Sequence, residues 1–174
     1  RKHLFRSALR TVGGIKNAIE FGANIGLNIH ALKNLYPEIN LSAIEINKEA
    51  VDRLLEIDDL IVHQGSVLDI HTRKLYDLVF SVGVLIHINP NDLENVYQNI
   101  YCLSSRYILI AEYYSPKPTS VAYRGYENKL FKRDFAGELL DKYVDLKLID
   151  YGFCYHRDPK MPLDDINWFL LEKV

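Results

Sequence analysis

A glycine turn between an apolar run and a helical pattern constrains this chain more than any other feature. The apolar run 17–21 ends at Gly22, and Gly26 follows four residues later, where a helical pattern with Ile25, Ile29, Leu32 and Leu35 on one face begins. Glycine is needed where the backbone turns sharply and lies against a ligand, because a Cβ atom would stand in the way. A second apolar run, 41–46, contains Glu45 near its end, nineteen residues after Gly26. A strand, a glycine turn, a helix and a second strand ending in an acid predict a nucleoside-binding βαβ unit, whose carboxylate accepts the ribose hydroxyls.

The spacing of the two glycines indicates which nucleoside is bound. Dinucleotide-binding folds use G-x-G-x-x-G, in which closely spaced glycines let a pyrophosphate rest on a helix N-terminus. Here the spacing is G-x-x-x-G, and no lysine follows it as in a P-loop. The carboxylate of Glu20 would repel an anion and favour a ligand with an ammonium and a sulfonium group. The pattern of Glu20, Gly22 and Gly26 followed by Glu45 resembles the first two motifs of class I S-adenosylmethionine-dependent methyltransferases.

The composition narrows the class of protein. The 174 residues, 48% of them hydrophobic, are ample for one packed domain and short for two, so we expect one domain across 1–174. A formal net charge of −2 and a pI of about 6.3 give no basic footprint for nucleic acid. No apolar run approaches the roughly 20 residues of a membrane-spanning helix, and no signal-peptide pattern opens the chain. We therefore expect a cytoplasmic protein in which Cys102 and Cys154 stay reduced.

Apolar runs alternate with helical patterns along the chain. The expected strands are residues 17–21, 41–46, 60–64, 76–84, 107–113, 144–153 and 167–172, and helices are expected at 4–12, 24–34 and 135–143. Two further helices turn Val51, Leu54 and Leu55, and Leu93, Val96, Ile100 and Leu103, toward the core. This order predicts a Rossmann-like α/β fold with a doubly wound, mostly parallel sheet and an antiparallel last strand. The Pro- and Tyr-rich stretch at about 114–132 is too long for a plain connector, and we expect a substrate-side insertion there.

The cofactor site is expected outside the carboxyl ends of the strands, where the strand order reverses. The methyltransferase resemblance implies that the turn after Gly22 passes beneath the methionine part of the cofactor and that Glu45 holds the ribose. Many such enzymes place an acid after the third strand, and here that acid is missing or shifted to Asp69. The residues predicted to bind the cofactor are Glu20, Gly22, Ala23, Asn24, Gly26, Glu45, Ile46, Asn47, Ser66, Val67, Ser81 and Gly83.

Three side chains are candidates for moving the acceptor's proton: His87, Glu112 and His156. His87 follows the fourth strand, over the expected cofactor, and an imidazole with an ordinary pKa near 6.5 (roughly that of model peptides) suits a general base. It could equally orient a loop through a backbone bond. A hydroxyl acceptor needs such a base, whereas a neutral amine only has to lose its proton.

Tyrosines and charged residues gather in the segments beyond the fifth strand. Tyrosine rings stack on the apolar faces of a small molecule, and arginines bind its carboxylate or phosphate groups. The residues predicted to bind the acceptor are Tyr113, Tyr114, Tyr123, Arg124, Arg133, Tyr155 and Arg157, although several of these tyrosines could instead be core residues. No spacing of His, Cys and Asp matches a metal-ligand set, so no metal is expected.

Several longer motifs extend the resemblance over nearly the whole chain: 18–28, 83–90, 111–114, 123–125, 130–137, 151–153 and 155–159. Together they resemble the pseudaminic acid biosynthesis-associated methylases, a methyltransferase subfamily found in bacterial surface-sugar gene clusters. The resemblance implies a soluble enzyme that uses S-adenosylmethionine, releases S-adenosylhomocysteine and methylates a small acceptor such as a sugar or nucleotide-sugar.

Two other classes stay open at this point. A nicotinamide-dependent dehydrogenase would share the βαβ unit and Glu45, but the missing third glycine and the acid at Glu20 argue against it. A binding module could keep the fold without performing chemistry. The methylated atom, oxygen or nitrogen, and the oligomeric state also stay open.

Overall fold

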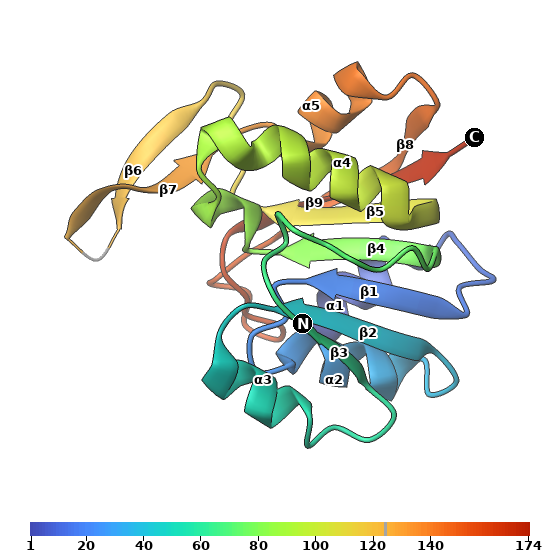
Figure 1. Cartoon of the computed structure of the whole chain (residues 1–174). Coiled ribbons are helices and arrows are strands. Elements are labelled where there is room, and N and C mark those ends of the chain that lie inside the picture. Colours follow the sequence, from blue (N-terminus) through green and yellow to red (C-terminus); the bar gives the residue numbers. More distant parts are fainter. Residues whose placement is uncertain (124) are drawn as a thin grey trace.

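The protein is built on a seven-stranded sheet in the order β3-β2-β1-β4-β5-β9-β8 (Figure 1). The computed structural model describes residues 1–123 and 125–174, without the side chains of residue 123 and residues 126–129. The strands of this sheet are β1 (Asn17–Phe21), β2 (Asn40–Glu45), β3 (Ile61–Gln64), β4 (Tyr76–Val82), β5 (Ser104–Glu112), β8 (Leu146–Cys154) and β9 (Ile166–Lys173). The first five strands pair in parallel, and β9 is antiparallel to both β5 and β8. The prediction of a doubly wound, mostly parallel sheet with an antiparallel last strand is confirmed.

Helices cover both faces of this sheet. Residues of α1 (Lys2–Ala8), α2 (Leu27–Leu35) and α3 (Lys48–Leu54) share one apolar cluster with Leu78 and Phe80 of β4. Residues of α4 (Leu93–Leu103) and α5 (Phe135–Lys142) share the opposite cluster with Val79. Alternate residues of β4 are thus buried on opposite faces, which explains its continuous apolar sequence. None of the helices described is long and apolar enough to cross a bilayer.

The first helix of the βαβ unit begins later than its sequence pattern indicates. Residues 22–26 form a turn, in which Asn24 has a φ of 49° and Gly26 has a φ of 80°, so the helix starts at Leu27. Ile25 therefore lies in the turn and is exposed, although the helical periodicity placed it on the buried face. The prediction for Leu55 is also wrong: α3 ends at Leu54, and Leu55 points to solvent with 64% of its surface exposed.

Other element ends differ by a few residues. The first helix ends at Ala8 and not at residue 12. The fourth strand stops at Val82, because residues 85–87 and 90–92 form two 3-10 turns, η1 (Leu85–His87) and η2 (Pro90–Asp92). The eighth strand begins at Leu146, and Val144, which was expected in it, is fully open to solvent.

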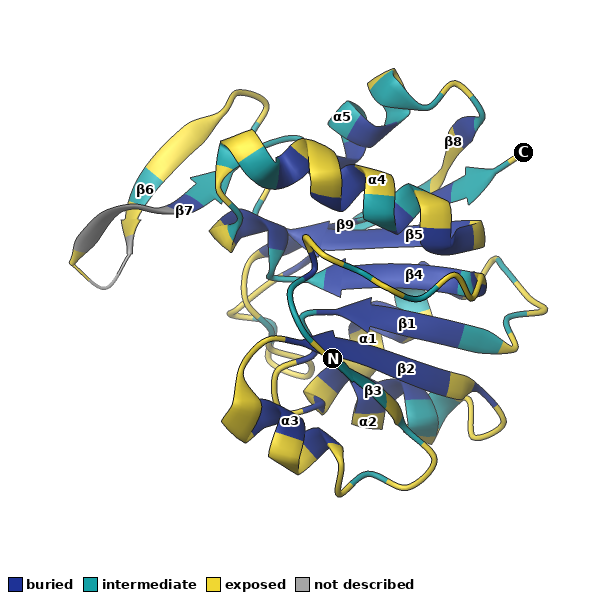
Figure 2. Ribbon diagram, in the orientation of Figure 1, coloured by how far each residue is buried: buried dark blue, intermediate teal, exposed yellow. Residues whose placement is uncertain are grey.

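The Pro- and Tyr-rich stretch forms a separate hairpin, β6 (Thr119–Tyr123) and β7 (Tyr126–Lys132). Figure 1 shows this hairpin projecting from the carboxyl ends of the central strands. It joins the body of the protein through an isolated bridge between Tyr114 and Arg133 and through Leu130, which is buried among α4 and α5 residues. In Figure 2 the central strands are buried, whereas much of β6 is exposed.

Candidate functional site

A cavity of about 940 Å³ opens at the carboxyl ends of β1, β2, β3 and β4. Its position is the point where the strand order reverses, between β1 and β4, which is where open α/β sheets bind ligands. The volume is near the top of the range of roughly 300–1,000 Å³ found for small-molecule sites, so the cavity has room for more than a nucleoside. Of the residues predicted to bind a cofactor, those that line it are Gly22, Ala23, Asn24, Glu45, Ile46, Asn47, Ser66, Val67 and Gly83.

Glu45 is held in place by the backbone on either side of it. Its Oε2 atom accepts a hydrogen bond from the Asn24 backbone N–H at 2.7 Å, and its Oε1 atom accepts one from the Asn47 backbone N–H, also at 2.7 Å. Each carboxylate oxygen has a second acceptor position, so both can still bind a hydroxyl group. The orientation of this carboxylate in the cavity is therefore fixed before any ligand arrives.

The two glycines of the turn have different roles. Gly22 has a φ of 73°, lines the cavity and donates its N–H to the carbonyl of Ile44. A Cβ atom on Gly22 would lie 2.7 Å from Cγ2 of Val84. Gly26 is not among the described residues that line the cavity, and a Cβ atom there would lie 2.7 Å from Cδ1 of Ile57. Gly26 is therefore required for the turn and for packing.

Glu20 is completely buried and does not line the cavity. Its Oε1 atom accepts a hydrogen bond of 2.6 Å from the side-chain amide of Asn28. In the part of the chain that the structure describes, its Oε2 atom has no hydrogen-bond partner. Burial raises the pKa of Glu20 to about 8, while the bond from Asn28 and the nearby charge of Arg1 act to lower it. A buried carboxylate oxygen without a donor is a site that a cationic ligand group would stabilise.

Asn28 is a site residue that sequence reasoning missed. It is buried, lines the cavity, and links Glu20 to Arg1, whose Nη1 atom donates to its Oδ1 atom at 2.9 Å. The sequence held a signal for this residue. Asn28 is next to Ile29 on the core-facing part of a helix, and a buried asparagine needs a hydrogen-bond partner. Further described residues of the lining that the sequence did not single out are Arg1, Glu49, Arg53, Leu163 and Ile166.

Glu112 and Ser81 do not line the cavity. Glu112 is 2% exposed and accepts hydrogen bonds from the Ser81 hydroxyl and from the backbone N–H groups of Val84, Leu85 and Ile86. Burial raises the pKa of Glu112 to about 7, and these four bonds oppose the rise. A carboxylate enclosed by four donors is placed to hold a loop.

His87 is the candidate proton acceptor that does line the cavity. It is the last residue of η1, and its backbone N–H bonds the carbonyl of Val84 at 2.9 Å. Ile86, Ile88 and Leu130 contribute apolar surface to the same cavity, and Tyr113 lines it from the end of β5. His156 is elsewhere: it is exposed, and its Nδ1 atom lies 2.8 Å from Oδ1 of Asp165.

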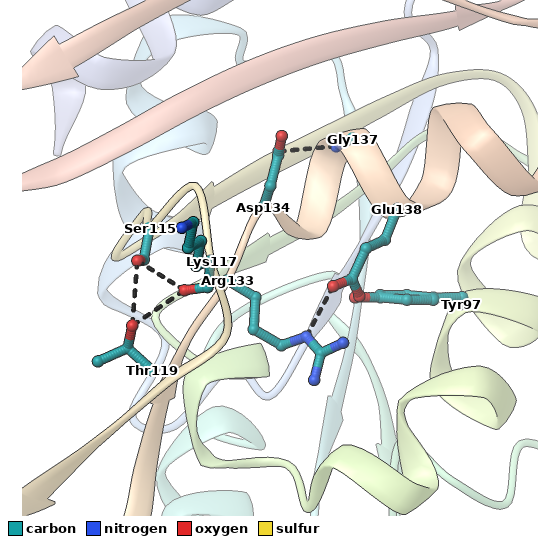
Figure 3. Close-up of polar contacts among 8 residues, drawn as sticks. All are labelled: Tyr97, Ser115, Lys117, Thr119, Arg133, Asp134, Gly137 and Glu138. Carbon is teal, nitrogen blue, oxygen red and sulfur yellow. Dashed lines mark hydrogen bonds and ion pairs between the residues drawn. The ribbon is translucent and has the colours of Figure 1, made fainter.

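Two of the residues predicted to bind an acceptor, Arg133 and Tyr114, have partners outside the cavity. Arg133 donates from Nε to Oε1 of Glu138 at 2.7 Å, and the other oxygen of Glu138 accepts the Tyr97 hydroxyl at 2.6 Å (Figure 3). The ring of Tyr114 lies against Phe169, at 5.9 Å between centroids. Tyr155 and Arg157 are exposed and are not among the described lining residues, while the Tyr123 side chain and Arg124 lie outside the described residues.

Metal binding has no evident site in the part of the chain that is described. Within residues 1–123 and 125–174, no group of three or more His, Cys, Asp and Glu side chains is placed to hold an ion.

Solved structures provide the comparison for this fold. No protein-family model matches the sequence, and no curated protein matches it either. The 1,6-didemethyltoxoflavin-N1-methyltransferase of Burkholderia thailandensis, solved with 1,6-didemethyltoxoflavin and S-adenosylhomocysteine, superposes with a TM-score of 0.75 at 15% identity, over 99% of this chain and 76% of that one. The chain has the class I methyltransferase fold.

Two further methyltransferase structures share this fold. The N-methyltransferase NodS of Bradyrhizobium japonicum gives a TM-score of 0.70 at 15% identity, over 98% of this chain and 92% of that one. An O-methyltransferase from a polyketide synthase of Brevibacillus brevis, solved with S-adenosylhomocysteine, gives 0.73 at 15% identity, over 100% of this chain and 71% of that one. Because both N- and O-methyltransferases superpose equally well, the fold does not decide between the two reactions.

Proposed function

We propose that this protein is an S-adenosylmethionine-dependent methyltransferase that acts on a small polar acceptor. The observation that carries the proposal is the carboxylate of Glu45, fixed by two backbone bonds in a cavity at the switch point of the sheet. The similar structures that were solved with S-adenosylhomocysteine support the same ligand.

The residues of the cavity fit the chemical groups of this cofactor. Glu45 would accept the two ribose hydroxyls, and the segments 46–47 and 66–67 would enclose the adenine. Asn28, which lines the cavity, would bond the ammonium group. Glu20, bonded to Asn28, would then lose its proton and supply the balancing negative charge, because a nearby cation lowers the pKa that burial has raised. When bound, S-adenosylmethionine supplies a methyl group on a sulfonium centre.

The contribution of the protein to the transfer would be mainly to position the acceptor. Aligning two reactants in a dry site removes much of the entropic barrier. Tyr113, Leu130 and Ile86 would form the wall against which the acceptor lies, and His87 would take its proton where the acceptor is a hydroxyl. For the acceptor itself, the pseudaminic acid resemblance supports a sugar or nucleotide-sugar of bacterial surface-glycan synthesis.

A ligand-binding module without transferase activity is the second candidate. One observation favours it: among the side chains predicted to hold an acceptor, Tyr113 alone is among the described residues that line the cavity. A protein that keeps the cofactor site and has lost the acceptor site would show this pattern.

Calorimetric titration with S-adenosylhomocysteine, and separately with NADH, tests the proposal. We expect micromolar binding of the first ligand and none of the second. Glu45→Gln should weaken binding about 10- to 100-fold, because an amide nitrogen cannot accept the backbone N–H bonds or the ribose hydroxyls. Glu56→Gln, an exposed residue outside the lining, is the matched control. Binding that is absent, or equal in both variants, would contradict the proposal.

Turnover then separates the enzyme from the binding module. The protein would be incubated with S-adenosylmethionine and a panel of sugars, nucleotide-sugars and amines, and methylated product would be detected by mass. Tight cofactor binding with no product from any acceptor would favour the binding module.

A further inference from the structure

A buried carboxylate that the proposed chemistry does not use lies at the end of β5. Glu112 is the last residue of this strand, is 2% exposed, and does not line the cavity. Its Oε1 atom accepts the Ser81 hydroxyl at 2.8 Å and the backbone N–H groups of Val84 and Leu85 at 3.0 and 3.1 Å. Its Oε2 atom accepts the N–H of Ile86 at 3.4 Å. A single side chain thus bonds three successive backbone groups.

These bonds fix the segment that follows β4, residues 83–88, here called the β4 loop. The N–H groups at the start of a short 3-10 turn such as η1 have no partner within the turn itself. Because they converge on one point, an anion at that point satisfies them together. A second bond, from the N–H of Gly83 to the carbonyl of Ala111 at 2.9 Å, joins the same loop to β5. The conformation of the β4 loop therefore depends on the end of β5.

The β4 loop forms one wall of the cavity. Gly83, Val84, Ile86, His87 and Ile88 all line it, whereas Glu112 stands behind them. The loop also reaches the glycine turn, since the Val84 side chain fills the space that a Cβ atom on Gly22 would occupy. A displacement of the loop would move His87 and release the turn that follows β1.

We propose that Glu112 is a positioning residue. Its carboxylate holds the β4 loop in the conformation that completes this wall of the cavity and orients His87. This inference rests on the proposed function only for its effect on cofactor binding. A carboxylate offers about four acceptor positions, whereas the oxygen of a glutamine offers two and its amide nitrogen would face N–H donors. Glutamine fills the same space and cannot make the same bonds.

Hydrogen exchange of the β4 loop in Glu112→Gln tests this without any ligand. We expect the amides of Val84, Leu85 and Ile86 to exchange at least about tenfold faster than in the wild type, while amides in β1 and β2 keep their rates. The affinity for S-adenosylhomocysteine should fall by about tenfold or more. Glu172→Gln, a half-buried carboxylate that bonds Arg106, is the control and should leave the loop amides unchanged.

A second variant keeps the test decisive. Ser81→Ala removes one donor and leaves the carboxylate, so it should give a smaller change of the same kind, even where Glu112→Gln folds poorly. Unchanged exchange in the loop of a folded Glu112→Gln protein would overturn the inference, as would a uniform increase across β1 and β2. If the wild type binds no S-adenosylhomocysteine, the proposed function fails, while the exchange rates still decide the role of Glu112.

Discussion

The two sides of the cavity are held by different kinds of contact. The side proposed to bind the cofactor, here called the cofactor side, is formed by the loops after β1, β2 and β4, which are fixed by bonds that involve the backbone, as at Glu45, Glu112 and Gly83. The side proposed to bind the acceptor, here called the acceptor side, includes Tyr113 and Leu130, and Leu130 belongs to a hairpin outside the main sheet. A two-stranded ribbon is marginally stable by itself, so this side depends on the contacts at the base of the hairpin.

These base contacts combine the backbone bridge between Tyr114 and Arg133 with several side-chain bonds. Figure 3 shows the Ser115 hydroxyl bonding the carbonyl of Lys117 near Thr119, and Arg133 reaching Glu138. Asp134 caps α5 by accepting the N–H of Gly137 at 2.8 Å. The cofactor side is thus part of the central sheet, whereas the position of the acceptor side depends on a few side-chain contacts at the base of the hairpin. We therefore expect substitutions to affect the two sides separately.

The largest effect is expected from the buried acid of the cofactor side. The pKa of Glu20 is raised from its ordinary 4.5 to about 8, mainly by burial. The folded chain then keeps a proton that the unfolded chain has released, so stability is full below pH 4.5, falls as the pH rises to 8, and is level above that. The loss is on the order of 5 kcal/mol. Urea unfolding between pH 5 and 9 should show this decline in the wild type.

Glu20→Gln isolates this contribution, because the amide stays neutral at every pH. The decline of stability with pH should therefore be much shallower in this variant. Glu112 adds a decline of the same sign up to about pH 7, since burial also raises its pKa. The exposed Glu56→Gln should keep the full decline of the wild type. Equal slopes in the wild type and Glu20→Gln would show that the carboxyl group is not held neutral.

The next largest effect should come from Gly22→Ala. Alanine at a φ of 73° is strained, and its Cβ atom would lie 2.7 Å from Cγ2 of Val84. We expect a loss of about 3 kcal/mol in the free energy of unfolding, and no measurable binding of S-adenosylhomocysteine. Gly13→Ala is the control, because a Cβ atom there would meet nothing within 4 Å. Retained binding in Gly22→Ala would mean that the turn is not part of the cofactor side.

The sequence predicted the strands and helices well because they alternate and because each is long enough to show its period. It placed the start of α2 wrongly, since the left-handed conformations of Asn24 and Gly26 leave no trace in hydrophobic periodicity. The β6–β7 hairpin was expected only as an insertion, because its Pro- and Tyr-rich sequence has no clear alternation.

The sequence also predicted the cofactor side of the cavity better than the acceptor side. Cofactor-side residues such as Glu45 follow strand ends, so their place could be inferred from the order of the strands. The directions of acceptor-side side chains depend on distant partners, and Arg133 turns to Glu138 of α5 in a way that no local pattern indicates.

A smaller effect, confined to the acceptor side, is expected from Leu130→Ala. Leu130 is 5% exposed and is packed in the cluster that contains α4 and α5 residues. Removing its side chain should cost about 2 kcal/mol, at the low end for a buried leucine because the hairpin can adjust. The affinity for S-adenosylhomocysteine should stay within twofold, while the KM of the acceptor rises. Leu75→Ala, at an exposed position away from the cavity, should change neither quantity.

The smallest effect, and the sharpest test of the comparison, is expected from Arg133→Ala. This change removes the bond to Glu138, whose other oxygen still accepts the Tyr97 hydroxyl. Because the Arg133 and Glu138 side chains are 22% and 29% exposed, solvent weakens their attraction and we expect a loss of only about 1 kcal/mol. The affinity for S-adenosylhomocysteine should be unchanged, whereas the KM of the acceptor should rise severalfold as the hairpin shifts.

Glu138→Gln separates the two roles open to Arg133. If Arg133 anchors the hairpin, both variants should raise the KM of the acceptor, Glu138→Gln by less, because its amide oxygen can still accept a bond from Nε of Arg133 but carries no charge. If Arg133 instead binds an anionic group of the acceptor, only Arg133→Ala should impair turnover, and it should do so without loss of stability. The surface pair of Arg106 and Glu172 is the control, and Arg106→Gln should leave both KM and cofactor affinity unchanged. A fall in cofactor affinity in Arg133→Ala as large as that in Glu45→Gln would mean that the two sides of the cavity are not independent.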